Sequence, residues 1–336
     1  MDIIMKRSVF FSGLMLIVSL LYTSCKTITE YPGENPVDPT LVNLNVKVSL
    51  SPDVADLTSP SDFESNVRQR LVVEVYRLNE GQKPVARQEV LLGKMLHEQD
   101  TTITLQVNAA KYRVVVWADY MRQMSPNDFY YYTATPLWGI KYSEEYMANN
   151  EEKDCFATRK DIDLTEYSEQ WNVNVDLDMP VNRPVGKLII IADDVEAFIS
   201  RAQSRGDEVS RAEINKFTAR VFYQQFVPNG YSAYGNELND ATTGVSYASR
   251  FTVLNDIEAM AAFDYLFASG EGTEYTIGMQ VFDAEGNLLN EVSGKTVTVK
   301  CNELTILRAD FLTGDYNPGI TIDQDYDGTI DVVLPD

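Results

Sequence analysis

Apolar and polar residues alternate one by one along much of this sequence. From Val42 to Leu50, five apolar side chains alternate with three polar amides or hydroxyls and one lysine. Successive side chains point to opposite faces of a β-strand, so this alternation predicts a strand with one buried face and one wetted face. Tyrosine, which suits half-buried strands, outnumbers phenylalanine by 19 to 14. We therefore expect sheets rather than a helical bundle.

Similar patterns recur in both halves of the chain. The predicted strands are 71–78, 103–107, 112–118, 173–177, 187–191, 218–226, 275–282, 296–301 and 304–309. Residues 188–191 are Leu-Ile-Ile-Ile, an unbroken apolar run that predicts a strand buried on both faces. The turn residues 283–287 are expected to join strands 275–282 and 296–301 as a hairpin.

Residues 180–186, Pro-Val-Asn-Arg-Pro-Val-Gly, interrupt the strand pattern and predict a domain boundary. We expect an all-β protein with an N-terminal β-sandwich domain over 41–180 and a C-terminal β-sandwich domain over 181–336. One short amphipathic helix is predicted near 194–205 in the second domain, with Asp193 and Asp194 able to cap its start. We expect it to lie across its own sandwich; a partner-binding helix is the alternative.

The first residues predict export. Lys6 and Arg7 precede an apolar run over 9–21, and small residues follow it, a pattern typical of a secretory signal peptide over 1–24. The run is too short to span a bilayer as a helix. Residues 21–25, Leu-Tyr-Thr-Ser-Cys, resemble a bacterial lipobox, with Tyr22 where leucine is usual.

The lipobox resemblance implies that Cys25 carries diacylglycerol and an acyl chain such as palmitate, which would hold the chain on a membrane. The alternative is an ordinary cleaved signal beside an incidental cysteine. Residues 25–40 contain three prolines and a glycine without apolar periodicity, which predicts a flexible tether between the lipid and the folded part.

Charge and residue types narrow the function. The net charge is −22, with 28 basic and 50 acidic residues, which disfavours nucleic acid and anionic bilayer surfaces as partners. His97 is the single histidine, so a His-based zinc site is not expected and a Ser-His-Asp triad would depend on this residue alone. Phosphate-binding glycine motifs are absent from the sequence. We expect no enzyme and no organic cofactor.

Cys155 and Cys301 are expected to be thiols, buried or beside a loop, with a disulfide between them as the alternative.

Two local motifs leave binding open. Asp323, Asp325 and Asp327 precede Gly328 as in the first half of an EF-hand calcium loop, but Leu334 stands at the twelfth position in place of glutamate. A weak calcium site and a solvated turn are the two interpretations. Aromatic residues over 129–132 and Trp138 could form a sugar-stacking platform, a subunit contact or ordinary strand packing.

Two further segments resemble the fimbrillin-type proteins of Bacteroidetes. Residues 112–120, Tyr-Arg-Val-Val-Val-Trp-Ala-Asp-Tyr, resemble a strand of that family. Residues 183–188, Arg-Pro-Val-Gly-Lys-Leu, are similar to the segment that opens its second domain, with Gly186 in place of alanine. The resemblance covers most of 25–336 and implies two tandem transthyretin-like β-sandwiches. It also implies a non-enzymatic lipoprotein of the outer membrane that takes part in type V fimbriae, or pili.

In that family, a protease that cuts after arginine or lysine removes the lipidated end with the first strand, and a neighbouring subunit's strand fills the groove. Here the removable strand would be 42–50, with Arg68 and Arg70 as candidate processing sites or as the solvated start of the next strand. Anchor subunits are not cut. The sequence leaves anchor and shaft open, and the insertion between 121 and 161 favours an anchor or accessory role. Expected partners are the outer membrane, other pilus subunits, and host or bacterial surface ligands. The alternative function is a surface lipoprotein that binds glycan or protein without polymerising.

Overall fold

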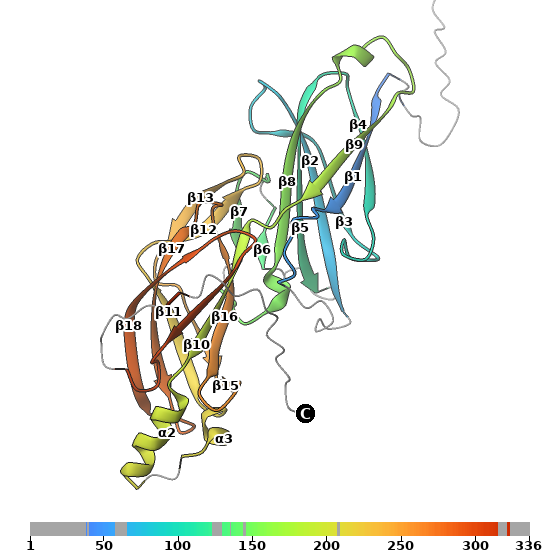
Figure 1. The fold of residues 1–336 in the computed structure, drawn as a ribbon. Coiled ribbons are helices and arrows are strands. Elements are labelled where there is room, and N and C mark those ends of the chain that lie inside the picture. The colour runs from blue at the N-terminus through green and yellow to red at the C-terminus, as the bar shows by residue number, and fades with distance from the viewer. Residues whose placement is uncertain are drawn as a thin grey trace, which may run out of the picture. The chain divides into compact units, whose positions relative to one another are not determined.

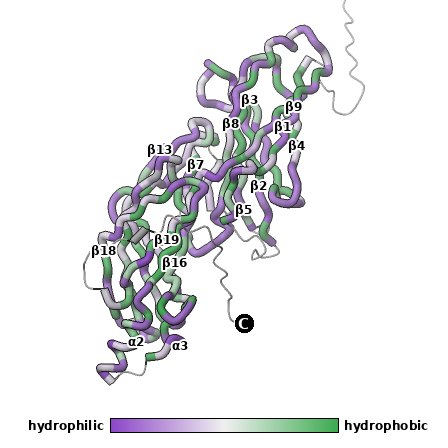
Figure 2. Tube along the Cα trace, viewed as in Figure 1, coloured by the Kyte–Doolittle hydropathy of each residue, from purple (hydrophilic) through white to green (hydrophobic). Residues whose placement is uncertain are grey.

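The computed structural model describes residues 38, 40–57, 66–122, 130–134, 136–143, 146–206, 209–314 and 321–322. Strands dominate these residues, as the alternating sequence predicts, and they form two β-sandwiches and one small additional sheet (Figure 1). Hydrophobic residues follow the strands, and the connecting turns are mostly hydrophilic (Figure 2). The predicted all-β sandwich class is confirmed.

Strand β1 (Val42–Leu50) lies in the middle of the first sheet of the first sandwich. It runs antiparallel to β4 (Thr101–Val107) and parallel to β9 (Asn174–Val181). The second sheet has the order β3-β2-β5-β8, built from β3 (Pro84–Leu91), β2 (Val67–Arg77), β5 (Lys111–Arg122) and β8 (Cys155–Asp163). Their inner faces share one core, whose buried members include Val46, Leu105, Met179, Leu71, Val116 and Phe156.

Strand β10 (Val185–Ala192) lies in the middle of the larger sheet of the second sandwich. Its order is β15-β16-β10-β19-β20, with β15 (Thr252–Val253), β16 (Ala259–Phe267), β19 (Leu304–Ala309) and β20 (Thr321–Ile322). The facing sheet has the order β14-β11-β17-β18, with β14 (Ser246–Arg250), β11 (Thr218–Gln224), β17 (Thr273–Phe282) and β18 (Leu288–Val299). Leu188 and Ile190 enter the core between the sheets, and Ile189 and Ile191 pack on the opposite face. The prediction of a strand buried on both faces is confirmed.

A third sheet was not predicted. It joins β6 (Tyr131–Tyr132) and β7 (Ile140–Tyr142), from the insertion in the first half, to β12 (Val227–Ser232) and β13 (Glu237–Thr242) from the second half. Trp117 of β5, Tyr231 of β12 and Phe267 of β16 are buried in one aromatic cluster under this sheet. The two sandwiches therefore share a core, although β9 ends and β10 begins within the predicted boundary 180–186. Division into two domains there stays a prediction.

Several element bounds differ from the predictions. The 218–226 segment ends as β11 at Gln224, and the chain turns at Gln225, whose φ is 69°. Strand β18 begins at Leu288, directly after the predicted hairpin turn, so 296–301 covers only its end. The predictions missed β3, β6, β7, β8, β12, β13, β14, β15, β16 and β20. Short 3-10 turns lie at Glu151–Lys153 (η2) and Thr165–Tyr167 (η3).

Helix α2 (Val195–Ser204) confirms the predicted helix, and the four-residue α3 (Arg211–Ile214) follows it. Asp194 stands at the N-cap position of α2, but its carboxylate accepts hydrogen bonds from the backbone N–H groups of Leu312 and Thr313 instead of from the helix. The capping prediction is wrong in this respect, because the carboxylate fastens the end of the second sandwich to the helix start.

Gly186 has a structural reason to differ from the alanine of the fimbrillin-type segment. A Cβ added there would lie 2.3 Å from the carbonyl oxygen of Lys300 and 2.5 Å from Val299 Cγ1. Because neither distance is sterically allowed, β10 can approach the β18–β19 turn this closely only with glycine at 186.

Candidate functional site

Strand β1 is an integral part of the first sandwich. Val42, Leu44, Val46 and Val48 are at most 1% exposed. On the wetted face, Lys47 Nζ pairs with Asp176 of β9 at 2.6 Å. Because β1 lies between β4 and β9, its removal would leave an apolar groove with unpaired backbone groups on both sides. The resemblance to fimbrillin-type proteins implies such a groove, and its formation in this chain stays a prediction.

The segment 51–57 after β1 is held by four side chains of the second half, which we call the clasp: Arg183, Lys187, Tyr265 and Asn302. Arg183 Nη1 donates to the carbonyl oxygen of Ala55 at 2.9 Å, and the Ala55 N–H donates to Asn302 Oδ1 at 3.0 Å. Lys187 Nζ donates to the carbonyl oxygen of Leu57 at 2.8 Å, and the Tyr265 hydroxyl oxygen lies 3.0 Å from the same carbonyl oxygen. The segment is therefore fixed through its backbone.

Arg183 is the centre of the clasp. Its Nε and Nη2 atoms donate to the two carboxylate oxygens of Asp154 at 2.7 and 2.9 Å, and Nη1 also donates to Asn302 Oδ1 at 2.9 Å. Arg183 is 3% exposed and Asp154 is fully buried. Burial alone would lower the pKa of Arg183, but the charge of Asp154 and its hydrogen bonds outweigh burial and raise the pKa. Arg183 therefore stays charged inside the protein.

A second clasp residue is also ion-paired. Lys187 Nζ lies 2.6 Å from Glu151 Oε1, and the Tyr265 hydroxyl donates to Glu151 Oε2 at 2.6 Å. Glu151 comes from η2, in the insertion of the first half, whereas Lys187 and Tyr265 come from β10 and β16 of the second half. The clasp thus joins three separate parts of the sequence around the segment 51–57.

The candidate processing sites lie inside β2, not before it. Arg68 pairs in register with Met121 of β5, and Arg70 lies between Leu91 of β3 and Asp119 of β5. Arg70 is 4% exposed, and its guanidinium donates to both carboxylate oxygens of Asp119, with Nε to Oδ1 at 2.8 Å. The idea of a solvated strand start is therefore wrong for Arg70. Processing at either residue stays a prediction, because a protease would have to open β2 first.

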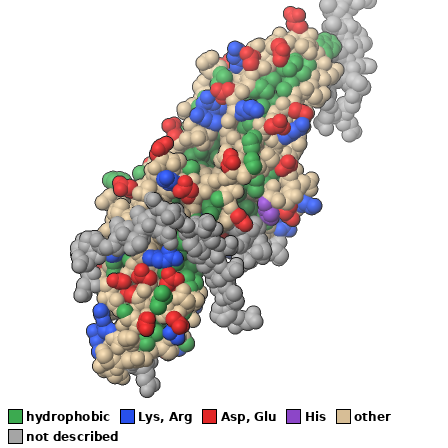
Figure 3. Space-filling model, in the orientation of Figure 1, with side chains coloured by type: hydrophobic (Ala, Val, Ile, Leu, Met, Phe, Trp, Pro, Cys, Tyr) green, Lys and Arg blue, Asp and Glu red, His purple; other side chains and the backbone are tan. Residues whose placement is uncertain are grey.

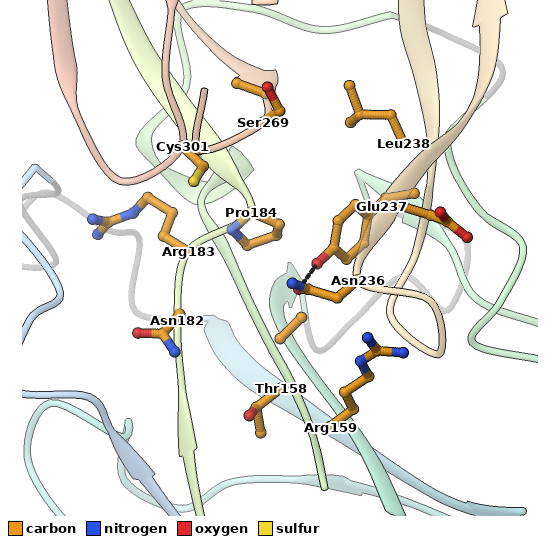
Figure 4. A pocket seen from close by; sticks show the side chains of 14 residues that line it. Thr158, Arg159, Asn182, Arg183, Pro184, Asn236, Glu237, Leu238, Ser269 and Cys301 are labelled. Carbon is orange, nitrogen blue, oxygen red and sulfur yellow. Dashed lines mark hydrogen bonds between the residues drawn. The ribbon is translucent and has the colours of Figure 1, made fainter. Parts of the chain in front are cut away.

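A cleft of about 590 Å³ lies beside the clasp (Figure 4). Its lining includes Thr158 and Arg159 of β8, Asn182 and Pro184 of the connection between β9 and β10, and Asn236 of the β12–β13 turn. Asn236 accepts a hydrogen bond from the Tyr231 hydroxyl at 2.6 Å, and Arg159 Nη1 donates to the Tyr234 carbonyl oxygen at 2.7 Å. The Arg183 guanidinium points away from the middle of the cleft, toward its clasp partners (Figure 4). Amide, hydroxyl and guanidinium groups thus surround a partly apolar floor.

The remaining predicted residues divide into three groups. Cys25, Asp323, Asp325 and Asp327 lie outside the described residues, so lipidation and calcium stay predictions. His97 is exposed, and the described part of the chain holds no group of three or more His, Cys, Asp or Glu residues that could bind a metal. Cys155 and Cys301 are free thiols, the first buried and the second half-buried, which confirms the thiol prediction. Burial raises the pKa of both.

The aromatic segment at 130–132 serves mainly in packing. Tyr130 and Tyr131 are buried, whereas Tyr132 and Trp138 are 43% and 38% exposed.

Acidic and basic side chains are interspersed over the face drawn in Figure 3 rather than gathered by sign. None of the described helices is both long and apolar enough to cross a membrane.

Sequence reasoning missed the buried ion pairs. Lys153 Nζ lies 2.6 Å from Asp264 Oδ1, both are at most 2% exposed, and the Tyr146 and Tyr223 hydroxyls also donate to Asp264. Burial lowers the pKa of Lys153, and Asp264 offsets part of this effect. Lys153 stands in the run Glu-Glu-Lys-Asp, which has the composition of a solvated surface, so the sequence carries no signal for this pair.

Comparison with solved structures finds low-identity similarities. The fimbrial anchor protein Mfa2 from Porphyromonas gingivalis is 9% identical, with 80% of this chain and 90% of that chain covered and a TM-score of 0.46. A presumed polysaccharide-binding protein (DUF1812) from Bacteroides thetaiotaomicron is 11% identical, with coverage of 84% and 99% and a TM-score of 0.49. A presumed adhesin from Bacteroides ovatus is 12% identical, with coverage of 90% and 96% and a TM-score of 0.45. At these values the similarities carry no argument about function.

The sequence itself gives a firmer assignment. None of the curated proteins matches it. Residues 35–335 match the family described as "Family of unknown function (DUF6562)". This match spans both sandwiches and most of the sequence. The chain therefore belongs to the family of unknown function DUF6562.

Proposed function

We propose that this chain is a lipid-anchored, non-enzymatic component of surface fimbriae that keeps its first strand and so acts as an anchor or accessory subunit. The observation that carries the proposal is the attachment of β1 and the segment 51–57. Four side chains of β1 are buried in the core of the first sandwich, and the clasp fixes the backbone that follows β1 to the second half. If β1 were removed after the protein had reached the membrane, the hydrogen bonds between the clasp and the segment 51–57 would have no role in the mature protein.

The position of Arg70 supports the anchor role. A protease binds its substrate as an extended, accessible segment, and exposed loops are the usual sites of cutting. Arg70 instead lies in the second strand of a four-stranded sheet, with paired strands on both sides and a buried ion pair to Asp119. Cutting there requires β2 to leave the sheet, so the lipid on Cys25 and strand β1 would remain on the mature protein.

With β1 retained, the chain fills its own groove and needs no donor strand. Strand addition between subunits would then use the groove of a neighbouring subunit rather than this one. The outer membrane, reached through the lipid, and other pilus subunits are the partners that this proposal implies. The cell surface is the corresponding location.

Release of fimbriae tests the anchor role. In cells that carry Cys25→Ser, fimbrial ladders on non-boiled gels should move from the membrane fraction to the medium, because the lipid no longer holds them. Palmitate labelling should disappear in the same variant. Ladders that stay equally membrane-bound in Cys25→Ser and wild-type cells would contradict an anchor role, even if palmitate labelling is lost.

The cleft favours a second candidate, a surface protein that binds saccharide without polymerising. The Asn182 amide and the Arg159 guanidinium at its edge are groups that bind sugar hydroxyls. This candidate predicts retardation in polysaccharide-containing native gels that is lost in Asn182→Ala with Arg159→Ala. Unchanged mobility of the wild-type chain across such gels would argue against it.

A further inference from the structure

Trp171 is an exposed tryptophan on a loop that contacts the core of the first sandwich through three other residues. The loop, residues 164–173, connects β8 to β9, and we call it the Trp171 loop. Leu164 is fully buried in the first core, and Tyr167 and Val173 pack against that core. The Trp171 side chain, in contrast, is 70% exposed. Phe226, between β11 and β12, is 74% exposed, so Trp171 is not alone in its exposure; its indole offers a large apolar contact surface with a polar N–H group.

The backbone of the Trp171 loop holds this side chain outward. The Gln170 N–H donates to the Tyr167 carbonyl oxygen at 3.0 Å, and Gln170 Nε2 donates to the Glu166 carbonyl oxygen at 3.2 Å. Asn172 adopts a left-handed conformation with φ of 55°, which asparagine tolerates better than most residues. The chain therefore turns directly after Trp171 and returns to the core at Val173.

The loop lies where the chain enters the first sandwich. Strands β1 and β9 are parallel and begin at the same end, with Asn43 opposite Asn174. The Asn43 N–H donates to the carbonyl oxygen of Val173 at 2.8 Å, only two residues from Trp171. In Figure 1 the β8–β9 connection and the start of β1 are at the same end of this sandwich. Trp171 is thus next to the point from which the predicted tether leaves.

The tether is short enough to keep this end near a membrane. Only 16 residues, 26–41, separate Cys25 from Val42. A flexible chain of this length has a root-mean-square extension of roughly 20–25 Å, and it reaches at most about 55 Å when fully extended. A lipid on Cys25 would therefore hold the Trp171 loop within a few nanometres of the bilayer surface, at a high effective concentration.

We propose that the Trp171 loop docks on the bilayer surface and seats the Trp171 indole among the lipid headgroups. Indole rings favour this interface because they combine an apolar body with a polar N–H group. The inference rests on the lipid anchor of the proposed function. It adds a second membrane contact, which would orient the first sandwich relative to the membrane instead of leaving it free on its tether.

The charges of the Trp171 loop determine which lipid headgroups it would favour. Glu166 and Glu169 are both exposed on the Trp171 loop. They would be repelled by anionic headgroups, so docking should favour zwitterionic lipid. On vesicles that contain anionic lipid, docking should weaken at low salt and recover as salt screens the repulsion.

The three tryptophans of the chain allow a direct test. The full lipidated chain would be reconstituted in phosphatidylcholine vesicles with brominated acyl chains, which quench nearby indole emission. Trp117 is fully buried, and Trp138 is 38% exposed with its indole N–H donating to the Gln82 carbonyl oxygen at 3.0 Å. If the three tryptophans emit equally, complete quenching of Trp171 by brominated lipid would lower the total tryptophan fluorescence of the wild type by up to roughly a third.

Trp138→Phe is the matched control. The proposal predicts that brominated lipid quenches the wild type and Trp138→Phe but leaves the emission of Trp171→Phe unchanged. Quenching that persists in Trp171→Phe, or no quenching of a wild-type chain that floats with the vesicles, overturns docking. A wild-type chain that floats with the vesicles is still anchored by its lipid. Flotation without quenching therefore overturns docking but not the anchor. A chain that neither carries lipid nor floats overturns both the anchor and the docking.

Discussion

Replacement of Arg183 tests how strongly the clasp stabilises the protein. Arg183→Met removes four hydrogen bonds donated over 2.7–2.9 Å and leaves the buried carboxylate of Asp154 without its counter-charge. Removal of one member of a buried ion pair costs about 3–5 kcal/mol. Both groups are almost completely buried, so solvent screening does not reduce this value. We therefore expect a loss of about 3–5 kcal/mol in the free energy of unfolding.

Urea unfolding of residues 26–336, followed by tryptophan fluorescence, measures this loss. Arg113→Met is the matched control, because Arg113 makes an equally short two-pronged pair with Asp161 but the two side chains are 21% and 49% exposed. That variant should lose about 1 kcal/mol or less. Arg183→Met combined with Asp154→Leu should recover much of the loss, because no charge is then left buried alone.

The reasoning would be refuted by a loss below about 1 kcal/mol in Arg183→Met. It would also be refuted if the double variant lost as much as the two single variants added together, since that result would mean that the two groups do not interact. Hydrogen exchange gives a local readout, because the Ala55 N–H donates to Asn302, which Arg183 holds. Its exchange should accelerate in Arg183→Met and stay unchanged in Arg113→Met.

Three other predictions concern the fold that carries the site. Leu44→Ala, on the buried face of β1, should lower the free energy of unfolding measured in urea by about 2–5 kcal/mol. Asn45→Ala, on the wetted face, should lower it by less than about 1 kcal/mol. Gly186→Ala should lower the free energy of unfolding by about 1–3 kcal/mol, because the new Cβ would lie 2.3 Å from a backbone carbonyl oxygen. Gly270→Ala adds its Cβ in open space and should change the melting temperature little. Equal melting temperatures for the two variants would contradict the steric argument. Hydrogen bonds from Thr165 lower the pKa of Asp163 to about 2, so its stabilising contribution is present above the ordinary carboxyl pKa and is lost as the pH falls toward 2. NMR titration of its carboxyl carbon should show a midpoint near 2, and a midpoint near 4 would contradict this.

The strands that the sequence predicts best are those with one clear face. Strand β1 begins and ends at the predicted residues, because its alternation of valine or leucine with polar residues matches a face that is buried and a face that is wet. Strands β3 and β13 both lie at sheet edges. In β3 the apolar residues do not alternate with polar ones, and β13 is mostly polar, so neither shows the period-two pattern of a half-buried strand. Pairing in space, rather than local pattern, makes these segments strands.

The candidate site was harder to predict because its residues meet only in three dimensions. Arg183 is 128 residues from Ala55 and 29 from Asp154. Nothing local distinguishes such an arginine from a solvated one. Arg70 shows the same problem, since it looks like the solvated start of a strand but is buried against Asp119. Charged residues that are buried by partners distant in sequence leave no periodic signal.

Retention of the first strand is the central claim, and the mass of the mature protein tests it most directly. Intact-mass spectrometry of the chain purified from the outer membrane, and of material sheared from the cell surface, identifies the N-terminal residue and any lipid. The account predicts one form in both fractions, beginning at acylated Cys25 and still containing Val42–Leu50. A surface form that begins at Gln69 or Leu71, directly after Arg68 or Arg70, would contradict it.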